Sequence, residues 1–352
     1  RRTLPENVTV THVTDNFGLI SGKQTSVITR ARKQINRLLL NIKIALKIMS
    51  IDRTENIDAL ETTNYYYLCL SYSFLPNRKP LITRFSSTTG QLRHYGNWRT
   101  SRVDIIEQLE IWMFKRSTVK LTHTHAHGKL IADQMNLPQK EIVIIPHGTS
   151  IQGNEEVAAP GNIDGGLRLL FLGRLETRKG IQTILDSLPE LISAYPRIQF
   201  RIAGEDEDGV YQKRFFEKHP ELSANVKFLG EISDQDKVVE YQSCDIFVAP
   251  SLYESFGLIY IEAMRFGIPV IACRSGGVPE VVADGVVGLL IEPGSVTELS
   301  KSMGKLIENP ELRKQMGRAA SHHVEKYFTA EKMALNSYRA LSEIRNDWSG
   351  TI

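Results

Sequence analysis

The second half of the chain alternates short apolar runs with amphipathic segments. Residues 167–172, 245–249 and 270–273 are rich in leucine, β-branched and aromatic side chains, as expected of strands that are buried on both faces. Residues 181–195 instead repeat apolar side chains at helical spacing. This alternation continues to about residue 306 and predicts a parallel α/β sheet that is covered by helices.

The first half has the same pattern in weaker form. Apolar runs at residues 80–85, 119–122 and 141–145 predict strands. Residues 25–49 predict a long helix in which lysines and arginines are interleaved with leucines and isoleucines. Its apolar positions extend around too much of the surface for an interfacial stripe, so we expect a buried helix with solvated cations. A helix that lies on an anionic membrane surface is the alternative.

Length and composition indicate two domains of a soluble protein. With 352 residues, the chain exceeds the usual size of a single core. We expect one domain in residues 1–150 and another in residues 165–330, because the segment between them is rich in Gly, Pro, Asn and Glu and has no periodicity, as in a hinge. A hydrophobic content of 41% and a charged content of 24% are ordinary for a soluble globular protein.

Charge and cysteine content narrow the class of protein. A formal net charge of +3 is too small to indicate a nucleic-acid partner. The three cysteines have no metal-like spacing and fit a reducing cytoplasm. Neither an apolar run of membrane-spanning length nor a signal peptide is visible. We therefore expect a cytoplasmic protein, either dissolved or peripheral at the inner face of the membrane.

The loop that follows residues 245–249 holds the first candidate chemistry. It connects the carboxyl end of a predicted strand to a helix N-terminus, where unpaired backbone N–H groups favour an anion. Glu254 lies in the loop, and Glu262 lies eight residues later on nearly the same face of the helix. A phosphate at the helix start and a polyhydroxylated group beside it would use both carboxylates. Two solvated surface glutamates are the alternative interpretation.

Two more predicted strand ends carry residues suited to phosphate. Gly173, Arg174 and Lys179 follow the strand at residues 167–172. An arginine offers phosphate oxygens a bidentate fork, and a lysine offers a compact charge. After the strand at residues 270–273, the sequence S-G-G at residues 275–277 would let the backbone approach a ligand closely.

These segments together resemble the GT4 family of retaining glycosyltransferases. The resemblance covers about residues 165–330 and rests on an ordered series: G-R-L-E-T-R-K-G at residues 173–180, I-A-G-E-D at 202–206, V-K-F-L-G at 226–230, the E-x7-E pair at 254 and 262, S-G-G-V-P-E at 275–280 and D-G-V-V-G-L-L at 284–290. It implies the GT-B fold, in which two Rossmann-like domains face a central cleft. The N-terminal domain would bind the acceptor, the second domain would bind the nucleotide sugar, and the C-terminal helix, residues 331–352, would cross back to the N-terminal domain.

The resemblance also implies an activity and the roles of individual residues. The chain would transfer a sugar from a UDP or GDP donor to an acceptor hydroxyl with retention of configuration, with no cofactor and no metal ion. Arg174 and Lys179 would stabilise the departing phosphate, and Glu254 would contact the donor sugar. Glu262 would accept hydrogen bonds from the ribose. The other expected donor-binding residues are Gly173, Leu229, Gly230, Ser255, Phe256, Gly257 and Leu258.

Two positions in the first domain are weaker candidates. Ser86 stands where the family usually has a histidine at the end of a strand; its hydroxyl can donate to a phosphate oxygen but carries no charge. His125 belongs to H-T-H-A-H at residues 123–127, and on a strand these histidines would point to one face, as in a zinc site. No carboxylate or cysteine in the sequence nearby completes such a site, so we expect a substrate contact instead. Likewise, we expect D-E-D at residues 206–208 to be a solvated acidic loop and not a metal-binding D-x-D segment.

Several functions stay open at this point. A sugar-nucleotide epimerase could use the same scaffold, although the motifs around Arg174 and Glu254 speak against it. A nucleotide-sugar-binding subunit without activity is the other alternative, supported by Ser86. The acceptor could be a saccharide, a lipid-linked saccharide or a protein.

Overall fold

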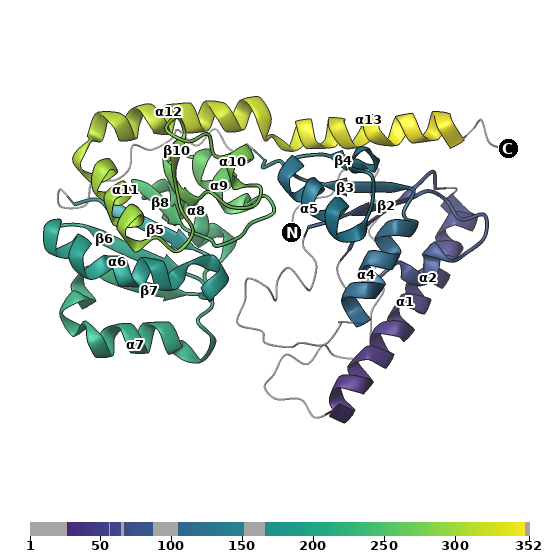
Figure 1. Ribbon diagram of the computed structural model, residues 1–352, viewed down its shortest axis with the longest axis horizontal. Coiled ribbons are helices and arrows are strands. Elements are labelled where there is room, and N and C mark those ends of the chain that lie inside the picture. The colour runs from purple at the N-terminus through teal and green to yellow at the C-terminus, as the bar shows by residue number, and fades with distance from the viewer. Residues whose placement is uncertain (1–26, 56, 65–66, 87–104, 151–165, 349–352) are drawn as a thin grey trace. The chain divides into compact units, whose positions relative to one another are not determined.

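The computed structural model describes residues 27–55, 57–64, 67–86, 105–150 and 166–348 (Figure 1). The strand that β-branched alternation predicts at residues 8–13 and the hinge segment lie outside these residues. The chain divides into two compact units: residues up to 90 together with 101–121 form unit 1, and residues 91–100 together with 122–352 form unit 2.

The first parallel sheet has the strand order β1-β2-β3-β4. Its strands and helices follow the predicted alternation, and the helix predicted at residues 25–49 is confirmed as Val27–Glu55. The elements are α1 (Val27–Glu55), β1 (Leu60–Thr63), α2 (Leu70–Ser73), β2 (Leu81–Arg84), α4 (Ile105–Arg116), β3 (Val119–Thr122), α5 (His125–Met135), the 3-10 turn Gln139–Glu141 and β4 (Ile142–Ile144).

Helix α1 is buried on one side only. Asn41, Ala45 and Ile48 are buried and Asn41 accepts a hydrogen bond from the backbone of Ser71. In contrast, four large apolar side chains of the same helix are exposed to solvent: Leu38, Leu39, Ile42 and Leu46. The expected buried helix with solvated cations is therefore wrong for the exposed face of α1, where large apolar side chains as well as cations meet solvent.

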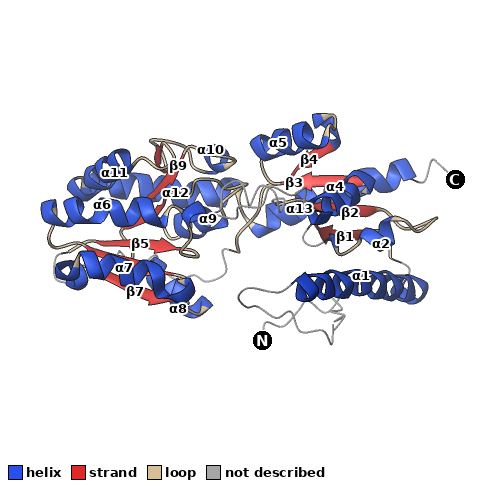
Figure 2. Cartoon of the chain, turned by 60° about the horizontal axis from the view of Figure 1, so that its bottom comes forward, coloured by secondary structure: helices blue, strands red, loops and turns tan. Residues whose placement is uncertain are grey.

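The second sheet contains six parallel strands in the order β10-β9-β8-β5-β6-β7. Figure 2 shows the strands in red, with a helix between each strand and the next along the chain. The elements are β5 (Arg168–Leu172), the 3-10 turn Thr177–Lys179, α6 (Ile181–Ala194), β6 (Gln199–Ala203), the 3-10 turn Glu207–Gly209, α7 (Val210–Lys218), the 3-10 turn Pro220–Ala224, β7 (Val226–Gly230), α8 (Asp234–Gln242), β8 (Ile246–Ala249), α9 (Leu258–Met264), β9 (Val270–Cys273), α10 (Val278–Val281), β10 (Gly288–Ile291), α11 (Val296–Glu308), α12 (Pro310–Tyr327) and α13 (Ala330–Trp348).

The core of this sheet includes three neighbouring strands that are buried on both faces. Every residue of β8, β9 and β10 is buried, so side chains on both faces are covered. Phe171, Phe200 and Phe247 are completely buried in the same apolar cluster. Continuous burial on both faces explains why the strands read as unbroken apolar runs, and it confirms the predicted parallel sheet.

A short break separates the last two helices. Helix α12 ends at Tyr327, and Thr329 pairs with Thr149 in an isolated bridge. The Thr149 N–H donates to the Phe328 carbonyl at 2.8 Å, and the Ala330 N–H donates to the Thr149 carbonyl at 3.1 Å. A Cβ on Gly148 would lie 2.2 Å from the Thr329 carbonyl oxygen. Helix α13 therefore begins directly against the chain segment that precedes residue 151.

Candidate functional site

Three of the predicted strand ends come together in unit 2. Strand β8 pairs in parallel with β5 on one side and with β9 on the other. Because carboxyl ends of parallel strands lie at one edge of a sheet, the loops after these strands are neighbours. The S-G-G turn packs directly on the loop of residues 250–257: the Gly277 N–H donates to the Glu254 carbonyl at 2.9 Å, and the Ser275 hydroxyl donates to the Leu252 carbonyl at 2.6 Å.

Glu254 and Lys179 form a short ion pair at this edge. The Lys179 ammonium lies 2.5 Å from Oε1 of Glu254, and their side chains are 17% and 12% exposed. The second carboxylate oxygen of Glu254 lies 3.7 Å from Arg178. One carboxylate from the loop after β8 is therefore held by two cations from the turn after β5, in a setting with little solvent screening.

Arg178 is a site residue that sequence analysis did not find. Its side chain is only 9% exposed, and its guanidinium donates to Glu176 at 2.8 Å and to the Tyr253 carbonyl at 3.4 Å. The sequence offers three nearby cations and nothing that separates their roles. The 3-10 turn Thr177–Lys179 makes the distinction, because it directs Arg178 inward against the loop after β8.

Arg174 occupies a different environment from the other two cations. Its side chain is 59% exposed, and its guanidinium lies 3.4 Å from Glu176. The preceding Gly173 has a φ of +154° and donates its N–H to the Ala203 carbonyl at 2.9 Å. A Cβ on Gly204 would lie 1.9 Å from the Gly173 carbonyl oxygen, so the turns after β5 and β6 approach each other through glycines. This leaves the Arg174 guanidinium directed to solvent beside the ion-paired cluster.

Glu262 lies on α9 and has a hydroxyl partner. The Tyr241 hydroxyl from α8 donates to Glu262 Oε2 at 3.2 Å. Burial raises the pKa of the Glu262 carboxyl above its usual value, and the hydrogen bond from Tyr241 opposes that change. Tyr241 is itself buried, and burial together with the nearby Glu262 charge raises the pKa of its hydroxyl well above the usual value. Glu262 is thus a partly desolvated acceptor that is oriented by a fixed donor.

The start of α9 is shaped by backbone packing. Gly257 has a φ of +87°, and a Cβ there would lie 2.4 Å from the Tyr260 ring. Phe256 is buried, with its ring centroid 5.6 Å from that of Phe328, and the Ser255 carbonyl accepts a hydrogen bond from Thr124 at 2.8 Å. Leu258 is partly exposed. The Phe256 side chain therefore anchors the loop, so a ligand at this turn would meet backbone groups and not the phenyl ring.

Leu229 and Gly230 end the edge strand β7. Gly230 has a φ of +66°, and its carbonyl accepts from the Gly204 N–H at 2.7 Å. Leu229 is half-buried, whereas Gly230 is exposed. Both residues lie at the carboxyl end of β7, separated from β5 by β6.

Asp206, the first residue of D-E-D, binds the start of a helix. Its carboxylate accepts hydrogen bonds from the backbone N–H groups of Tyr211 and Gln212 at 3.2 and 2.9 Å, at the start of α7. Over the described part of the chain, no group of three or more His, Cys, Asp and Glu side chains is arranged to hold a metal ion.

The strand interpretation of H-T-H-A-H is wrong. Strand β3 ends at Thr122 and α5 begins at His125, because Thr124 caps the helix and accepts from the His127 N–H. His125 is exposed, and its N–H donates to Glu280 at 2.8 Å. His127 is fully buried, and its Nδ1 lies 2.7 Å from the Thr122 hydroxyl. Burial lowers the pKa of His127 to about 4. The histidines therefore do not share a face as a strand would require.

Ser86 belongs to unit 1. It follows β2, its side chain is exposed, and its N–H donates to the Asn64 side chain at 3.0 Å. Ser86 thus lies at the carboxyl end of a strand, and its contact with the donor stays a prediction.

Comparison with known proteins identifies relatives for the second half of the chain. Residues 154–323 match the family described as Glycosyl transferases group 1. A GDP-mannose-dependent monoacylated alpha-(1-6)-phosphatidylinositol monomannoside mannosyltransferase of Corynebacterium glutamicum is 36% identical over 167 residues, which are 46% of this chain and 43% of that protein. A phosphatidyl-myo-inositol mannosyltransferase of Mycolicibacterium smegmatis is 31% identical over 201 residues, or 55% and 50% of the two chains. The chain thus spans about half the length of these curated relatives.

Solved structures resemble a larger part of the chain. A sucrose-phosphate synthase from Thermosynechococcus elongatus has a TM-score of 0.73 and 20% identity, covering 90% of this chain and 79% of that one. Anabaena HepE, solved with UDP and glucose, has a TM-score of 0.68 and 20% identity, covering 85% and 80%. Together with the two parallel sheets, these likenesses confirm the expected fold: the chain has the GT-B architecture, and residues 154–323 match the glycosyl transferases group 1 family.

Proposed function

We propose that this protein is a retaining glycosyltransferase of the GT4 family, which moves a sugar from a nucleoside-diphosphate donor to an acceptor hydroxyl without a metal ion. The observation that carries the proposal is the cluster of Lys179, Arg178 and Glu254, which lies at the carboxyl edge of the second sheet beside two glycine-rich turns. It combines a cation for a diphosphate, Lys179, with a carboxylate for sugar hydroxyls that Arg178 helps to orient, within a domain that matches a glycosyltransferase family.

Cations would take the place of a metal ion at the diphosphate. Negative charge grows on the β-phosphate as its bond to the sugar breaks. The exposed guanidinium of Arg174 can swing towards that charge, and Lys179 can share its ammonium between Glu254 and a phosphate oxygen. Backbone N–H groups of Gly257 and Leu258 would complete the anion site.

The two glutamates would recognise hydroxyl groups on either side of the diphosphate. Glu254 is held in place by Lys179 and Arg178, so its oxygens can accept from the donor sugar without rearrangement. Glu262 would accept from the ribose hydroxyls, with Tyr241 fixing the orientation of its carboxylate. Leu229 and Gly230 would lie against the base.

Retention would follow from attack on the same face of the sugar. The bond from the anomeric carbon to the phosphate oxygen breaks, the bond to the acceptor oxygen forms, and the acceptor proton passes to the departing phosphate. The ion pairs of Glu254 reduce its nucleophilicity, which speaks against a covalent intermediate at that residue.

The relatives guide the choice of substrates. One relative is named as GDP-mannose-dependent, and a structural neighbour was solved with UDP and glucose, so both bases are candidate donors. Relatives named for phosphatidylinositol favour a lipid-linked saccharide acceptor. The exposed apolar residues of α1, with Lys43 and Lys47 beside them, would allow peripheral contact with the inner face of a membrane from the cytoplasm. No helix within the described residues has the length and apolarity needed to cross a membrane.

A donor-binding experiment tests the proposal. Thermal unfolding would be followed in EDTA with UDP-, GDP- and ADP-sugars, using the parent chain, Arg174→Ala, Glu262→Ala and the control Lys301→Ala on α11. A donor at about 100 times its Kd should add roughly 3 kcal/mol to the free energy of unfolding. We expect one donor series to stabilise the parent and the control but neither site variant.

Each other outcome has a definite meaning. Stabilisation by no donor would reject the proposed function. Conversion of the donor sugar without an acceptor would indicate an epimerase. Binding without transfer or hydrolysis over a broad acceptor panel would indicate a subunit that lacks activity.

A further inference from the structure

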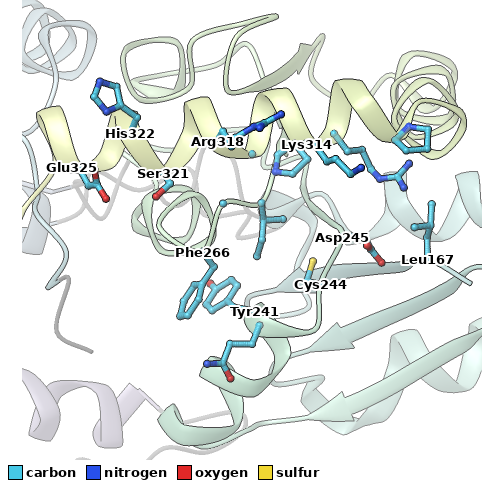
Figure 3. A pocket seen from close by; sticks show the side chains of 17 residues that line it. Leu167, Tyr241, Cys244, Asp245, Phe266, Lys314, Arg318, Ser321, His322 and Glu325 are labelled. Atoms are coloured by element: carbon cyan, nitrogen blue, oxygen red, sulfur yellow. The ribbon is translucent and has the colours of Figure 1, made fainter. Parts of the chain in front are cut away.

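Unit 2 contains a cavity at the opposite edge of the sheet from the candidate site. Its volume is about 840 Å³, and it is bounded by α12, the end of α8 and the segment between α9 and β9 (Figure 3). Asp245 and Pro269, which line it, immediately precede β8 and β9. The cavity is therefore at the amino edge of the sheet, whereas Glu254 and Lys179 lie at the carboxyl edge.

The interior of the cavity is apolar. Tyr241 and Phe266 form one wall, with ring centroids 5.5 Å apart and an interplanar angle of 17°. Cys244 and Ile268 are buried beside them. These side chains would accept an apolar ligand body without leaving a polar group unpaired.

Helix α12 is held firmly over this interior. A Cβ on Gly317 would lie 2.0 Å from the Gly267 carbonyl oxygen, so the helix touches the backbone before β9. This contact leaves no room for the helix to settle further into the cavity. The cavity therefore exists because the backbones of α12 and residue 267 are in contact, and not because a side chain is too small to fill it.

The rim is positively charged along one face of α12. Lys314 and Arg318 lie four residues apart on α12, and both belong to the lining of the cavity (Figure 3). Like charges four residues apart on a helix repel each other, so an anion bound between Lys314 and Arg318 would relieve that repulsion.

Acidic residues offset part of this charge. Glu311 pairs with Lys314 at 3.1 Å, although both side chains are exposed to solvent. Asp245 accepts from the Arg168 N–H at 2.8 Å and lies in the field of Arg313, whose guanidinium donates to the carbonyls of Leu306 and Ile307. Glu325 is at the far end of the row on α12. The excess of positive charge is therefore centred on Arg318.

We propose that this cavity binds a small amphipathic anion, with a phosphate-like head at Lys314 and Arg318 and an apolar body over Phe266 and Cys244. A volume of about 840 Å³ is within the range of roughly 300 to 1,000 Å³ that is usual for small-molecule sites. A lipid drawn from a membrane and a dissolved amphipathic phosphate share this chemistry. The cavity is lined by none of the residues proposed to bind the nucleotide sugar; the two sites share only Tyr241, which forms a wall of the cavity and donates to Glu262.

The test uses monomeric dodecyl phosphate as the probe. Isothermal titration calorimetry on the whole chain, without nucleotide sugar, would compare the parent with three variants. Lys314→Glu/Arg318→Glu reverses the rim charge, Ser321→Trp fills the cavity, and Lys301→Glu is the charge-reversed control on α11. Unchanged far-UV circular dichroism would establish that each variant is folded.

We expect saturable binding to the parent and the control, and at least tenfold weaker binding to the rim and cavity-filling variants. Dodecanol, which lacks the anionic head, should also bind at least tenfold more weakly. The absence of binding to the parent, or equal binding to all folded variants, would overturn the proposal. Co-sedimentation with phosphatidylcholine vesicles containing phosphatidic acid then distinguishes a membrane lipid from a dissolved ligand. If both site variants lose binding to the vesicles, the ligand is a lipid. If vesicle binding is unchanged, the ligand is a dissolved phosphate.

Discussion

The ammonium of Lys179 lies 2.5 Å from the carboxylate of Glu254 and joins the turn after β5 to the loop after β8. The two residues are 75 positions apart, so this contact depends on the parallel pairing of the two strands. In the proposed function, the cation expected to bind phosphate and the carboxylate expected to accept from sugar hydroxyls are thus within one hydrogen bond of each other. Substituting either residue should therefore affect both functions.

Replacing Lys179 with alanine should lower the rate of sugar transfer by about 10²- to 10³-fold, because one donor to the developing phosphate charge is lost. Glu254 would keep Arg178 as its partner, so the fold should persist. Steady-state kinetics with a fixed acceptor would measure the effect, with Lys301→Ala as the control. A transfer rate within threefold of the parent would rule out the proposed role of Lys179.

Replacing Arg178 with methionine should act through Glu254 and not on the phosphate directly. The variant loses the contacts of a buried guanidinium with Glu176, Glu254 and the Tyr253 carbonyl, and should be destabilised by about 1–3 kcal/mol. We expect a higher KM for the nucleotide sugar, whereas the Kd of the free nucleoside diphosphate should stay nearly unchanged. Equal weakening of both ligands would show that Arg178 contacts the diphosphate itself.

Gly180 and Gly294 offer a matched pair of substitutions. Both have similar left-handed backbones, with φ values of +74° and +79°. A Cβ on Gly180 would lie 2.0 Å from the Pro250 carbonyl oxygen, whereas one on Gly294 meets nothing within 4 Å. Gly294→Ala should therefore cost only the backbone strain of about 1 kcal/mol, and Gly180→Ala should cost about 1–3 kcal/mol more. Urea unfolding would give both values, and equal costs would contradict the tight contact at Pro250.

We expect the charged Glu262 carboxylate to lower the free energy of unfolding and to support donor binding. Burial raises its pKa, so the folded state prefers the protonated carboxyl, and the free energy of unfolding falls as pH rises from about 4.5 through the raised pKa. Glu262→Gln removes this titration and should be relatively more stable above that range. Donor binding should weaken by about 10- to 100-fold, because charged acceptors of the ribose hydroxyls are lost.

Urea unfolding from pH 4 to 8, together with donor titrations at pH 8, would measure both effects of Glu262→Gln. Tyr241→Phe is the matched control: it removes the hydrogen bond that lowers the pKa of Glu262, so its stability should fall more steeply with pH than that of the parent. Identical pH profiles for all three proteins would contradict the assigned environment of Glu262.

Sequence alone predicted those parts of the site that depend on local order. Apolar runs located β5, β8 and β9, and the glycines and charges after them located the loops, because strand ends in a parallel sheet share an edge. Arg178 and Tyr241 were missed, since their roles depend on contacts with residues 75 and 21 positions away. Local spacing carries no information about such partners.

The errors also have physical causes. The alternation in H-T-H-A-H is compatible with a strand, but the capping hydrogen bond of Thr124 selects a helix. The apolar residues of α1 encircle the helix, and their number gives no indication of how much of the surface unit 1 would cover. In both places a tertiary or capping contact decides between structures that the pattern allows.

His127 should make the protein sensitive to acid. Its pKa is about 4 in the folded state, against the usual 6.5, because the ring is buried beside Thr122. Above pH 6.5 the ring is neutral in both states; as pH falls from 6.5 to 4, only the unfolded state takes up the proton, so the free energy of unfolding should fall by about 3 kcal/mol. His127→Gln cannot titrate and should lose this part of the pH dependence, whatever its stability at pH 8. Urea unfolding of both proteins between pH 4 and 8 would measure how steeply the free energy of unfolding changes with pH. Parallel curves for the two proteins would contradict the prediction, since the ring would then be protonated in the folded protein and α5 would open to admit the charge.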